Sequence, residues 1–467
     1  MTMTENNEPH ITFFGGAGSV TGANFLFTTG GPKPLRVLVD CGLIQGGKVC
    51  NDENYRAFEY DPATIDALFV THGHLDHIGR IPKLVRDGFN GAIYSTPATR
   101  EISELLLNDS LGVMGKEAAR DHKPLLYQEE DVAKAITLWK TIPYYTPTQI
   151  TEDFSVTIKD AGHILGSSMF EFLYCGKKFV FTGDLGNSPA PLLRDTDAIT
   201  DANYLVMESV YGDRDHEHAD ERALRLKEVI TQSIKQGGAL MIPAFSVERT
   251  QNLLYAINTL VEEEEIPSVP IFLDSPLAIK VTSVYEKRIQ NFKQGVQEEI
   301  REGDDIFNFP KLKRTLLTEE SKGINAVPNP KIIIAGSGMS NGGRIIHHEK
   351  RYLPDPKSTL LLVGYQAVGS LGRLLQDGAK EVKILGEHVP VRARIAQISG
   401  YSAHKDSHGL VEFVSHTAPT LERVFVAMGE PKSSLFLAQR LRDYVGVEAV
   451  VPEPGETYTV PCSARKK

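Results

Sequence analysis

The chain has 467 residues, with 41% hydrophobic and 24% charged residues, which is enough for one or two substantial cores. Its net charge of −10 gives no support to a broadly basic phosphate-gripping surface. The sequence has no run of eighteen apolar residues and no signal-peptide pattern, which argues against a membrane span and against secretion. Four scattered cysteines without a CxxC pair (Cys41, Cys50, Cys175 and Cys462) favour reduced thiols. We therefore expect a cytoplasmic protein.

The first two hundred residues read mainly as short strands separated by glycine-rich turns, with helices in between. Strands then dominate again over 155–181. This mixture predicts layered sheets flanked by helices. The strands expected first are 10–14, 23–27 and 36–39, and the helices are 80–86 and 99–109.

From about Asp220 the rhythm changes to an alternation of helices and short apolar runs. Such an alternation is typical of parallel strands joined by crossover helices, so we expect a second domain of different architecture. The helices are expected at 223–236 and 248–261, and the strands at 239–242, 269–273, 331–335 and 359–363.

The run Ile65–Val70 predicts an apolar strand that leads directly into THGHLDHIGR. His72 and His74 alternate, so both imidazoles can project to one side at a strand end. Asp76 and His77 follow as the chain turns toward a helix. A lone histidine is usually a core or surface residue, but three imidazoles and one carboxylate within six positions favour a zinc centre.

Further polar residues follow other predicted strands in the same way. His163 lies in a glycine-flanked turn, DAGHILGS, and Asp184 follows an apolar run in FTGDLG. Asp40 ends the predicted strand 36–39. Each alone reads as a turn or capping residue. Together they indicate polar groups collected at strand ends above a layered sheet.

In their order along the chain, Asp40, the HxHxDH pattern at 72–77, His163 and Asp184 resemble the motifs of the metallo-β-lactamase fold. Glu208 in ESVYGDR and His404 in GYSAHKD resemble signatures of its β-CASP branch, which processes nucleic acids. The segments IPAFSVERTQ, GSGMSNGGR and GYQAVGSLGR look like the RNA-acting members, related to the nuclease subunit of the cleavage and polyadenylation specificity factor.

This resemblance covers nearly the whole chain and implies an α/β protein. A metallo-β-lactamase αββα sandwich would hold an inserted β-CASP domain, whose mostly parallel sheet is flanked by helices. The expected ranges are 1–208 for the first part of the lactamase-like domain, 209–392 for the β-CASP domain and 393–467 for the C-terminal return.

The resemblance also implies a two-zinc site. One zinc would be held by His72, His74 and His163. A second would be held by Asp76 and His77, with Asp184 bridging both ions and Asp40 orienting a ligand by hydrogen bonding. Zinc lowers the pKa of a bound water toward about 7 and neutralises charge that develops on a phosphodiester.

The remaining implied roles concern catalysis and substrate. His404 would donate a proton to the leaving 3′ oxygen, with Glu208 as its partner, and Asp76 and Asp184 would also belong to the catalytic set. Ser337, Gly338 and Arg344 are expected to contact RNA. The expected activity, endo- or exonucleolytic, leaves 5′-phosphate and 3′-hydroxyl ends. The expected partners are RNA, taken as single-stranded, and a second copy of the chain.

One position departs from the family pattern. Met428, in VAMGE, stands where RNA-acting members carry a histidine of the second zinc site. A neutral thioether is a poor zinc ligand, so this site is expected to be weakened. The alternatives are therefore a catalytically impaired RNA-binding or scaffold protein, then a DNA nuclease or a small-molecule hydrolase.

Overall fold

The computed structural model describes residues 8–45, 52–216, 219–364, 366 and 369–462. The chain divides into two compact units. Unit 1 comprises Met1–Ala190, Arg194–Asp215 and His404–Lys467, and unit 2 comprises Pro191–Leu193 and His216–Ala403. The domain limits expected from the sequence stay a prediction.

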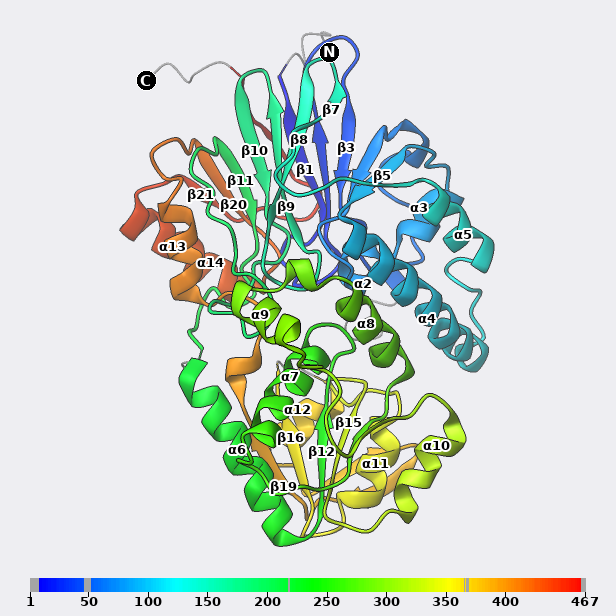
Figure 1. Cartoon of the computed structure of the whole chain (residues 1–467). Helices are drawn as coiled ribbons and strands as arrows, with labels where there is room; N and C mark the ends of the chain where they lie inside the picture. The colour runs from blue at the N-terminus through cyan, green and yellow to red at the C-terminus, as the bar shows by residue number, and fades with distance from the viewer. Residues whose placement is uncertain (1–7, 46–51, 217–218, 365, 367–368, 463–467) are drawn as a thin grey trace. The chain divides into compact units, whose positions relative to one another are not determined.

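Unit 1 is built on two mixed sheets, which together contain fourteen strands in the described part of the chain (Figure 1). The order in the first sheet is β22 (Thr457–Thr459), β1 (His10–Gly15), β2 (Asn24–Thr28), β3 (Arg36–Val39), β4 (Ala67–Phe69), β5 (Ala92–Ser95) and β6 (Trp139–Thr141). The order in the second is β21 (Ala449–Val450), β20 (Arg423–Val426), β11 (Tyr204–Met207), β10 (Lys177–Phe181), β9 (Ser168–Tyr174), β8 (Phe154–Asp160) and β7 (Thr148–Thr151).

The main core of unit 1 lies between these sheets. Alternate residues of the facing strands are buried there, as the period of two in a strand requires. Phe27 of β2 is central, with its ring centroid 4.8 Å from that of Phe179 on β10. Burying such aromatic rings is worth about 1.5–3 kcal/mol each.

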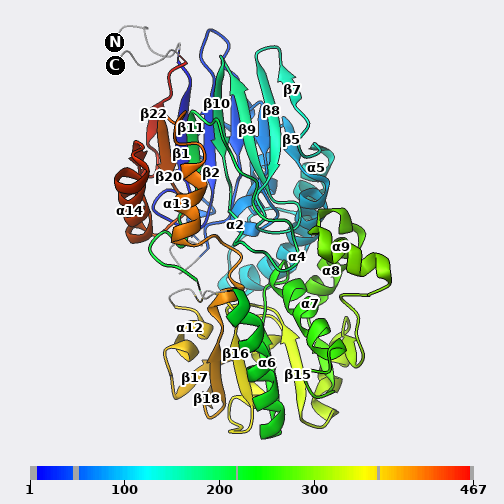
Figure 2. The same cartoon turned by 60° about the vertical axis from the view of Figure 1, so that its left-hand side comes forward.

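Helices cover the outer faces of unit 1. Next to the second sheet, Leu410 of α13 and Leu437 of α14 pack into a buried cluster with Leu205 of β11 (Figure 2). The other helices accompany the first sheet (Figure 1). The bounds are α2 (Leu75–Ile78), α3 (Ile81–Arg86), α4 (Pro97–Asp121), α5 (Glu129–Thr137), α13 (Ser407–Ser415) and α14 (Pro431–Arg440), with single turns at η1 (Pro62–Thr64) and η5 (Leu441–Val445).

Unit 2 contains a six-stranded sheet within its described residues, and every pairing in it is parallel. This confirms the expected fold class, an α/β architecture with a mostly parallel sheet in the inserted region. The strand order is β14 (Leu312–Arg314), β13 (Ile271–Leu273), β15 (Lys331–Ala335), β12 (Ala239–Pro243), β16 (Thr359–Leu362) and β19 (Arg394–Gln397).

Ile345 of α11 and Leu375 of α12 pack on this sheet, together with the hairpin β17 (Glu381–Ile384)–β18 (Glu387–Pro390). The helices of unit 2 are α6 (Ala219–Gln236), α7 (Arg249–Glu262), α8 (Pro276–Lys287), α9 (Gln294–Glu302), α10 (Thr318–Gly323), α11 (Ile345–Tyr352) and α12 (Leu371–Gln376), with turns at η2 (Ile289–Asn291), η3 (Ile324–Ala326) and η4 (Ser399–Tyr401).

Two sequence-based expectations need correction. Helix α4 continues to Asp121 rather than ending near Asp109, because the exposed Gly112 and the half-buried Gly115 lower helix propensity without interrupting the helix. Cys175 and Cys462 form a disulfide across 287 positions, with Cα atoms 5.9 Å apart, so they are not the reduced thiols expected. Cys41 is free and buried, and Cys50 lies outside the described residues. Among the described helices, none combines the length and apolarity that a membrane span needs.

Candidate metal centre

The polar residues of the predicted site follow strands that run in the same direction within each sheet of unit 1. Asp40 and His72 come after the parallel pair β3 and β4, and Asp184 and Glu208 come after the parallel pair β10 and β11. His163 follows β8, which runs in the same direction as β10 because both are antiparallel to β9. The site residues therefore lie just beyond the carboxyl ends of these strands.

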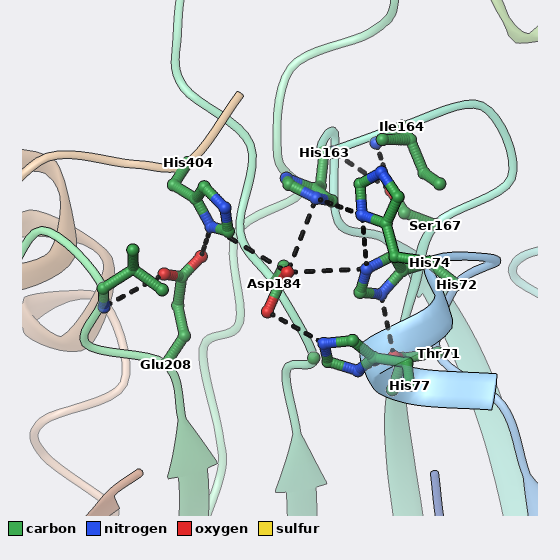
Figure 3. Close-up of polar contacts among 12 residues, drawn as sticks. Thr71, His72, His74, His77, His163, Ile164, Ser167, Asp184, Glu208 and His404 are labelled. Carbon is green, nitrogen blue, oxygen red and sulfur yellow. Dashed lines mark hydrogen bonds and ion pairs between the residues drawn. The ribbon is translucent and has the colours of Figure 1, made fainter. Parts of the chain in front are cut away.

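Four side chains of the predicted site converge on one point (Figure 3), those of His72, His74, His163 and Asp184. His72 Nε2 and His74 Nδ1 are 3.1 Å apart, and His163 Nε2 is 3.3 Å from His74 Nδ1. Asp184 Oδ2 lies 3.4 Å from His72 Nε2 and 3.5 Å from His163 Nε2. His72, His163 and Asp184 are buried and His74 is half-buried.

This donor set fits a divalent metal ion. In a tetrahedral zinc site with bonds of 2.0–2.1 Å, neighbouring ligand atoms are separated by about 3.3 Å. The separations of 3.1–3.5 Å around His74 and Asp184 agree with that edge length. Unprotonated imidazole nitrogens and a carboxylate oxygen are all acceptors, and a shared cation satisfies them together.

A buried aspartate and a threonine orient the metal ligands through hydrogen bonds. Asp40, with φ of 60°, accepts hydrogen bonds from the backbone N–H and the hydroxyl of Thr71, both at 2.8 Å. Thr71 Oγ1 also lies 3.1 Å from His72 Nδ1. These contacts fix the ring of His72 with Nε2 toward the convergence point, as outer hydrogen bonds do in metal sites. The resemblance named Asp40 for this role but not Thr71, whose only sequence signal is its place beside His72.

The other half of the predicted two-metal site is less complete. His77, on α2, lies between two carboxylates, with Nδ1 2.7 Å from Asp40 Oδ2 and Nε2 3.4 Å from Asp184 Oδ1. Asp76 is half-buried beside it. Among the described residues, neither side chain belongs to a group of three or more donors that converge closely enough to hold an ion.

Met428 follows β20 at the position where a further ligand was expected. Its side chain is buried in the core between the two sheets, and its Cγ lies 3.2 Å from where a Cβ on Gly16 would stand. Its backbone N–H donates to the carbonyl of Gly16 at 2.5 Å. The thioether thus serves as core packing.

Glu208 and His404 form a second group that meets the first at Asp184 (Figure 3). His404 Nδ1 lies 3.3 Å from Glu208 Oε1 and 3.9 Å from Asp184 Oδ2. The backbone N–H groups of Leu185 and Val210 donate to Glu208 at 2.6 and 3.3 Å. The buried carboxylate is therefore held rigidly against the imidazole.

Burial and neighbouring charge shift the pKa values of these groups in different directions. Burial, reinforced by the nearby His77, lowers the pKa of His72 well below 6.5. Burial opposes protonation of His77, but Asp184 and Asp40 raise its pKa well above 6.5. Burial also opposes protonation of His404, yet Glu208 and Asp184 raise its pKa to about 9. Burial raises the pKa of Glu208 despite the attraction of His404.

The residues expected to contact RNA lie in unit 2, at the carboxyl ends of its strands. Ser337 donates its backbone N–H to the carbonyl of Gly342 and accepts the N–H of Asn341 at its hydroxyl. Gly338 is buried. Arg344 donates to the carbonyl oxygens of Thr315 and Leu316 at 2.9 and 2.8 Å, as well as to an aspartate.

That aspartate, Asp274, was missed in the sequence, although it follows an apolar strand in the same way as Asp40 and Asp184. It is fully buried and accepts four side-chain hydrogen bonds. We call this set the Asp274 cluster. Its donors are Thr315 Oγ1 (2.6 Å), Ser321 Oγ (2.6 Å), Arg344 Nη1 (2.7 Å) and His348 Nε2 (2.7 Å).

Three family models match the chain. The metallo-beta-lactamase superfamily matches residues 23–229, the Beta-Casp domain matches 250–375, and the Zn-dependent metallo-hydrolase RNA specificity domain matches 388–452.

Relatives match nearly the whole chain. It is 36% identical to Ribonuclease TTHA0252 of Thermus thermophilus over 92% of this chain and 95% of that protein. It is 33% identical to Transcription termination factor FttA of Methanosarcina mazei, over 94% of this chain and 69% of that protein. A protein of unknown function from Enterococcus faecalis V583 shares the fold, with a TM-score of 0.56, 13% identity and coverage of 97% of this chain and 100% of that one. The chain therefore belongs to the β-CASP family of metallo-β-lactamase-fold, RNA-processing nucleases.

Proposed function

We propose that this protein is a zinc-dependent ribonuclease that hydrolyses phosphodiester bonds of single-stranded RNA and leaves 5′-phosphate and 3′-hydroxyl ends. The observation that carries the proposal is the convergence of four ligand atoms, from His72, His74, His163 and Asp184. His404, paired with Glu208, lies 3.9 Å from the same Asp184 carboxylate. A small-molecule hydrolase needs no such pair beside its metal ligands. The similarity to a ribonuclease over nearly the full length also favours RNA.

His72, His74, His163 and Asp184 would hold the principal zinc. When bound, zinc supplies a nucleophilic water of lowered pKa and offsets the negative charge that grows on the phosphodiester. The protein groups then have separate tasks. Asp40 and Thr71 keep His72 oriented, and the rigid scaffold fixes the reacting geometry.

His404 is the proposed proton donor to the leaving 3′ oxygen. Glu208 engages Nδ1 of this imidazole, which leaves Nε2 as the nitrogen that delivers the proton. We expect His404→Ala to lower kcat by about 10²–10⁴-fold while the zinc content stays unchanged. Glu208→Gln should have a smaller effect, because it keeps a hydrogen-bond acceptor for the imidazole. Loss of zinc from the His404 variant would contradict this division of roles.

The deciding experiment for the function is incubation of the zinc-loaded protein with end-labelled RNA, single-stranded DNA and a thioester, each with and without a chelator. Chelator-sensitive cleavage of RNA alone supports the proposal if the 5′ ends of the products take up labelled phosphate only after phosphatase treatment, which shows a 5′-phosphate. The 3′ ends should be extended by poly(A) polymerase without any pretreatment, which shows a 3′-hydroxyl. Chelator-sensitive cleavage of DNA or of the thioester would replace it with the corresponding hydrolase.

A second candidate function rests on Met428. If a second zinc is required for hydrolysis, the loss of its histidine ligand makes the protein an RNA-binding or scaffold homologue. RNA binding without chelator-sensitive cleavage would favour this candidate.

We propose that the second zinc, near His77 and Asp76, is bound weakly. Metal analysis should give about one tightly held zinc per native chain, and Met428→His should raise that value toward two. Met428→Leu is the matched control, since it preserves the apolar volume without adding a ligand. Two tightly held zinc ions in the native protein would contradict the proposal.

A further inference from the structure

Unit 2 exposes an aromatic ring at the edge of its sheet where ligands of parallel α/β sheets bind. Phe245 follows β12, and its neighbour in space, Gly338, follows β15, the strand adjacent to β12. Since every strand of this sheet is parallel, both residues lie beyond the carboxyl ends of the strands. That edge is the usual ligand-binding side of an open α/β sheet.

The ring of Phe245 rests face-down on Gly338. A Cβ added to Gly338 would stand 2.6 Å from Cδ2, 2.8 Å from Cε2 and 2.9 Å from Cγ of that ring. Three consecutive ring atoms at nearly equal distances place this position above the face of the ring, because an in-plane approach would leave the two flanking carbons much farther away. A side chain at position 338 would therefore displace the ring.

The neighbours of Phe245 leave it partly exposed. Phe245 is 37% exposed, although Gly338 beneath it is buried. Its position is fixed, because its carbonyl accepts hydrogen bonds from both the backbone N–H and the hydroxyl of Thr250 at the start of α7. Gly338 is fixed as well, since its carbonyl accepts a hydrogen bond from Gln366 at 3.1 Å.

The ring also has polar neighbours suited to a nucleotide. The hydroxyl oxygen of Ser246 lies 3.8 Å from where a Cβ on Gly336 would stand, and Ser337, which follows Gly336, is half-buried. A flat apolar surface with hydroxyl groups around it matches a base with its attached sugar and phosphate.

We propose that Phe245, seated on Gly338, is a stacking platform for one base of the RNA substrate. This inference rests on the proposed function and adds the site in unit 2 that engages a base. Stacking on an aromatic ring accepts every base, because each has a π-face, so the platform contributes affinity and positioning without strict sequence choice.

The test is binding of the zinc-loaded protein to single-stranded phosphorothioate RNA, measured by fluorescence anisotropy. Removing one base–aromatic stack weakens binding by about 5- to 100-fold, so Phe245→Leu should raise Kd by that factor. Phe245→Trp should restore affinity to near the native value. Gly338→Ala should weaken binding as well, through displacement of the ring. Leu385→Ala, which removes another exposed apolar side chain of unit 2, in the β17–β18 turn, is the matched control and should leave Kd unchanged.

An abasic scan locates the contact. With one base removed at each position in turn, the native protein should lose affinity most at one position, and Phe245→Leu should show no further loss there. The same scan profile in both proteins, or native affinity of Phe245→Leu for intact RNA, overturns the stacking proposal alone. A native protein that neither binds nor cleaves RNA overturns the proposed function and this inference with it.

Discussion

Both units place a buried aspartate at the carboxyl ends of parallel strands and surround it with nitrogen-bearing side chains. Around Asp184 in unit 1, imidazole nitrogens and carboxylate oxygens face one another at 3.1–3.5 Å, and these atoms are mostly acceptors. Around Asp274 in unit 2, every partner donates, at 2.6–2.7 Å. The two sites therefore differ in whether the groups around the aspartate accept or donate hydrogen bonds, more than in the types of residue. Acceptors around Asp184 attract a cation, whereas donors around Asp274 already satisfy its carboxylate and make it a structural contact.

The pKa values express the same difference. Burial opposes ionisation of Asp274, but its hydrogen bonds from His348, Ser321, Thr315 and Arg344 hold the pKa of that carboxyl well below its usual range. Glu349, on the neighbouring helix α11, is equally buried, but within the described part of the chain Ser340 is its one hydrogen-bond donor. Burial accordingly raises the pKa of Glu349 to about 7.

The largest expected effect distinguishes the two clusters by metal content. His72→Ala should lose the tightly bound zinc and lower cleavage of RNA by at least about 10³-fold, because several kcal/mol of transition-state stabilisation disappear. His348→Ala, which removes a histidine from the Asp274 cluster, should leave the zinc content at the native value. Elemental analysis of both purified variants measures this. If the His72→Ala protein still held zinc at the native level, the proposed difference between a metal site at Asp184 and a metal-free Asp274 cluster would be wrong.

The next effect concerns stability. Asp274→Ala should reduce the free energy of unfolding by about 3–5 kcal/mol, because it leaves the buried side of Arg344 and His348 without their acceptor. Denaturant unfolding followed by circular dichroism provides the measurement. Asp274→Asn, which retains one acceptor oxygen, should be intermediate. Equal stability of the alanine variant and the native protein would show that the junction is not structural.

The smallest effect is a dependence of stability on pH that arises from Glu349. The folded protein keeps its proton up to about pH 7, whereas in the unfolded chain the carboxyl releases it near pH 4.5. The free energy of unfolding should therefore fall as the pH rises from about 4.5 to 7, by up to about 3 kcal/mol at 1.4 kcal/mol for each pKa unit.

Glu349→Gln should remove this decrease, since the amide does not ionise and still accepts the hydrogen bond from Ser340. The two proteins are compared by thermal unfolding at several pH values between 4.5 and 8. The native protein should lose stability relative to the variant as pH increases. A constant difference over this range would show that Glu349 ionises normally.

Much of the fold and of the metal centre could be predicted because the signals are local. The parallel strands of unit 2 appear as apolar runs between helices, and His72, His74 and His77 lie within one short stretch. The remaining residues depend on contacts that no local pattern specifies. Cys175 and Cys462 pair across 287 positions through the arrangement of strands. Phe245 and Gly338 meet only because β12 and β15 are neighbours.

Asp274 differs from these cases, because its signal was present in the sequence. It follows an apolar strand, as Asp184 does, and precedes Ser275, whose hydroxyl caps helix α8. Nothing nearby indicates that four donors will surround it, since they come from three later segments of the chain. The position of the Asp274 carboxylate at a strand end could therefore be predicted from the sequence, but its hydrogen-bond donors could not.

The place of β20 has a consequence for the order in which the molecule is made. This strand lies inside the second sheet, between β11 and β21, but the ribosome synthesises the whole of unit 2 before it. Until β20 emerges, β11 presents an unpaired edge that can capture other chains. His404, just upstream of β20, arrives equally late. A nascent chain can therefore complete unit 2 while its nuclease centre still lacks its proposed acid, so premature release would yield an inactive, aggregation-prone product.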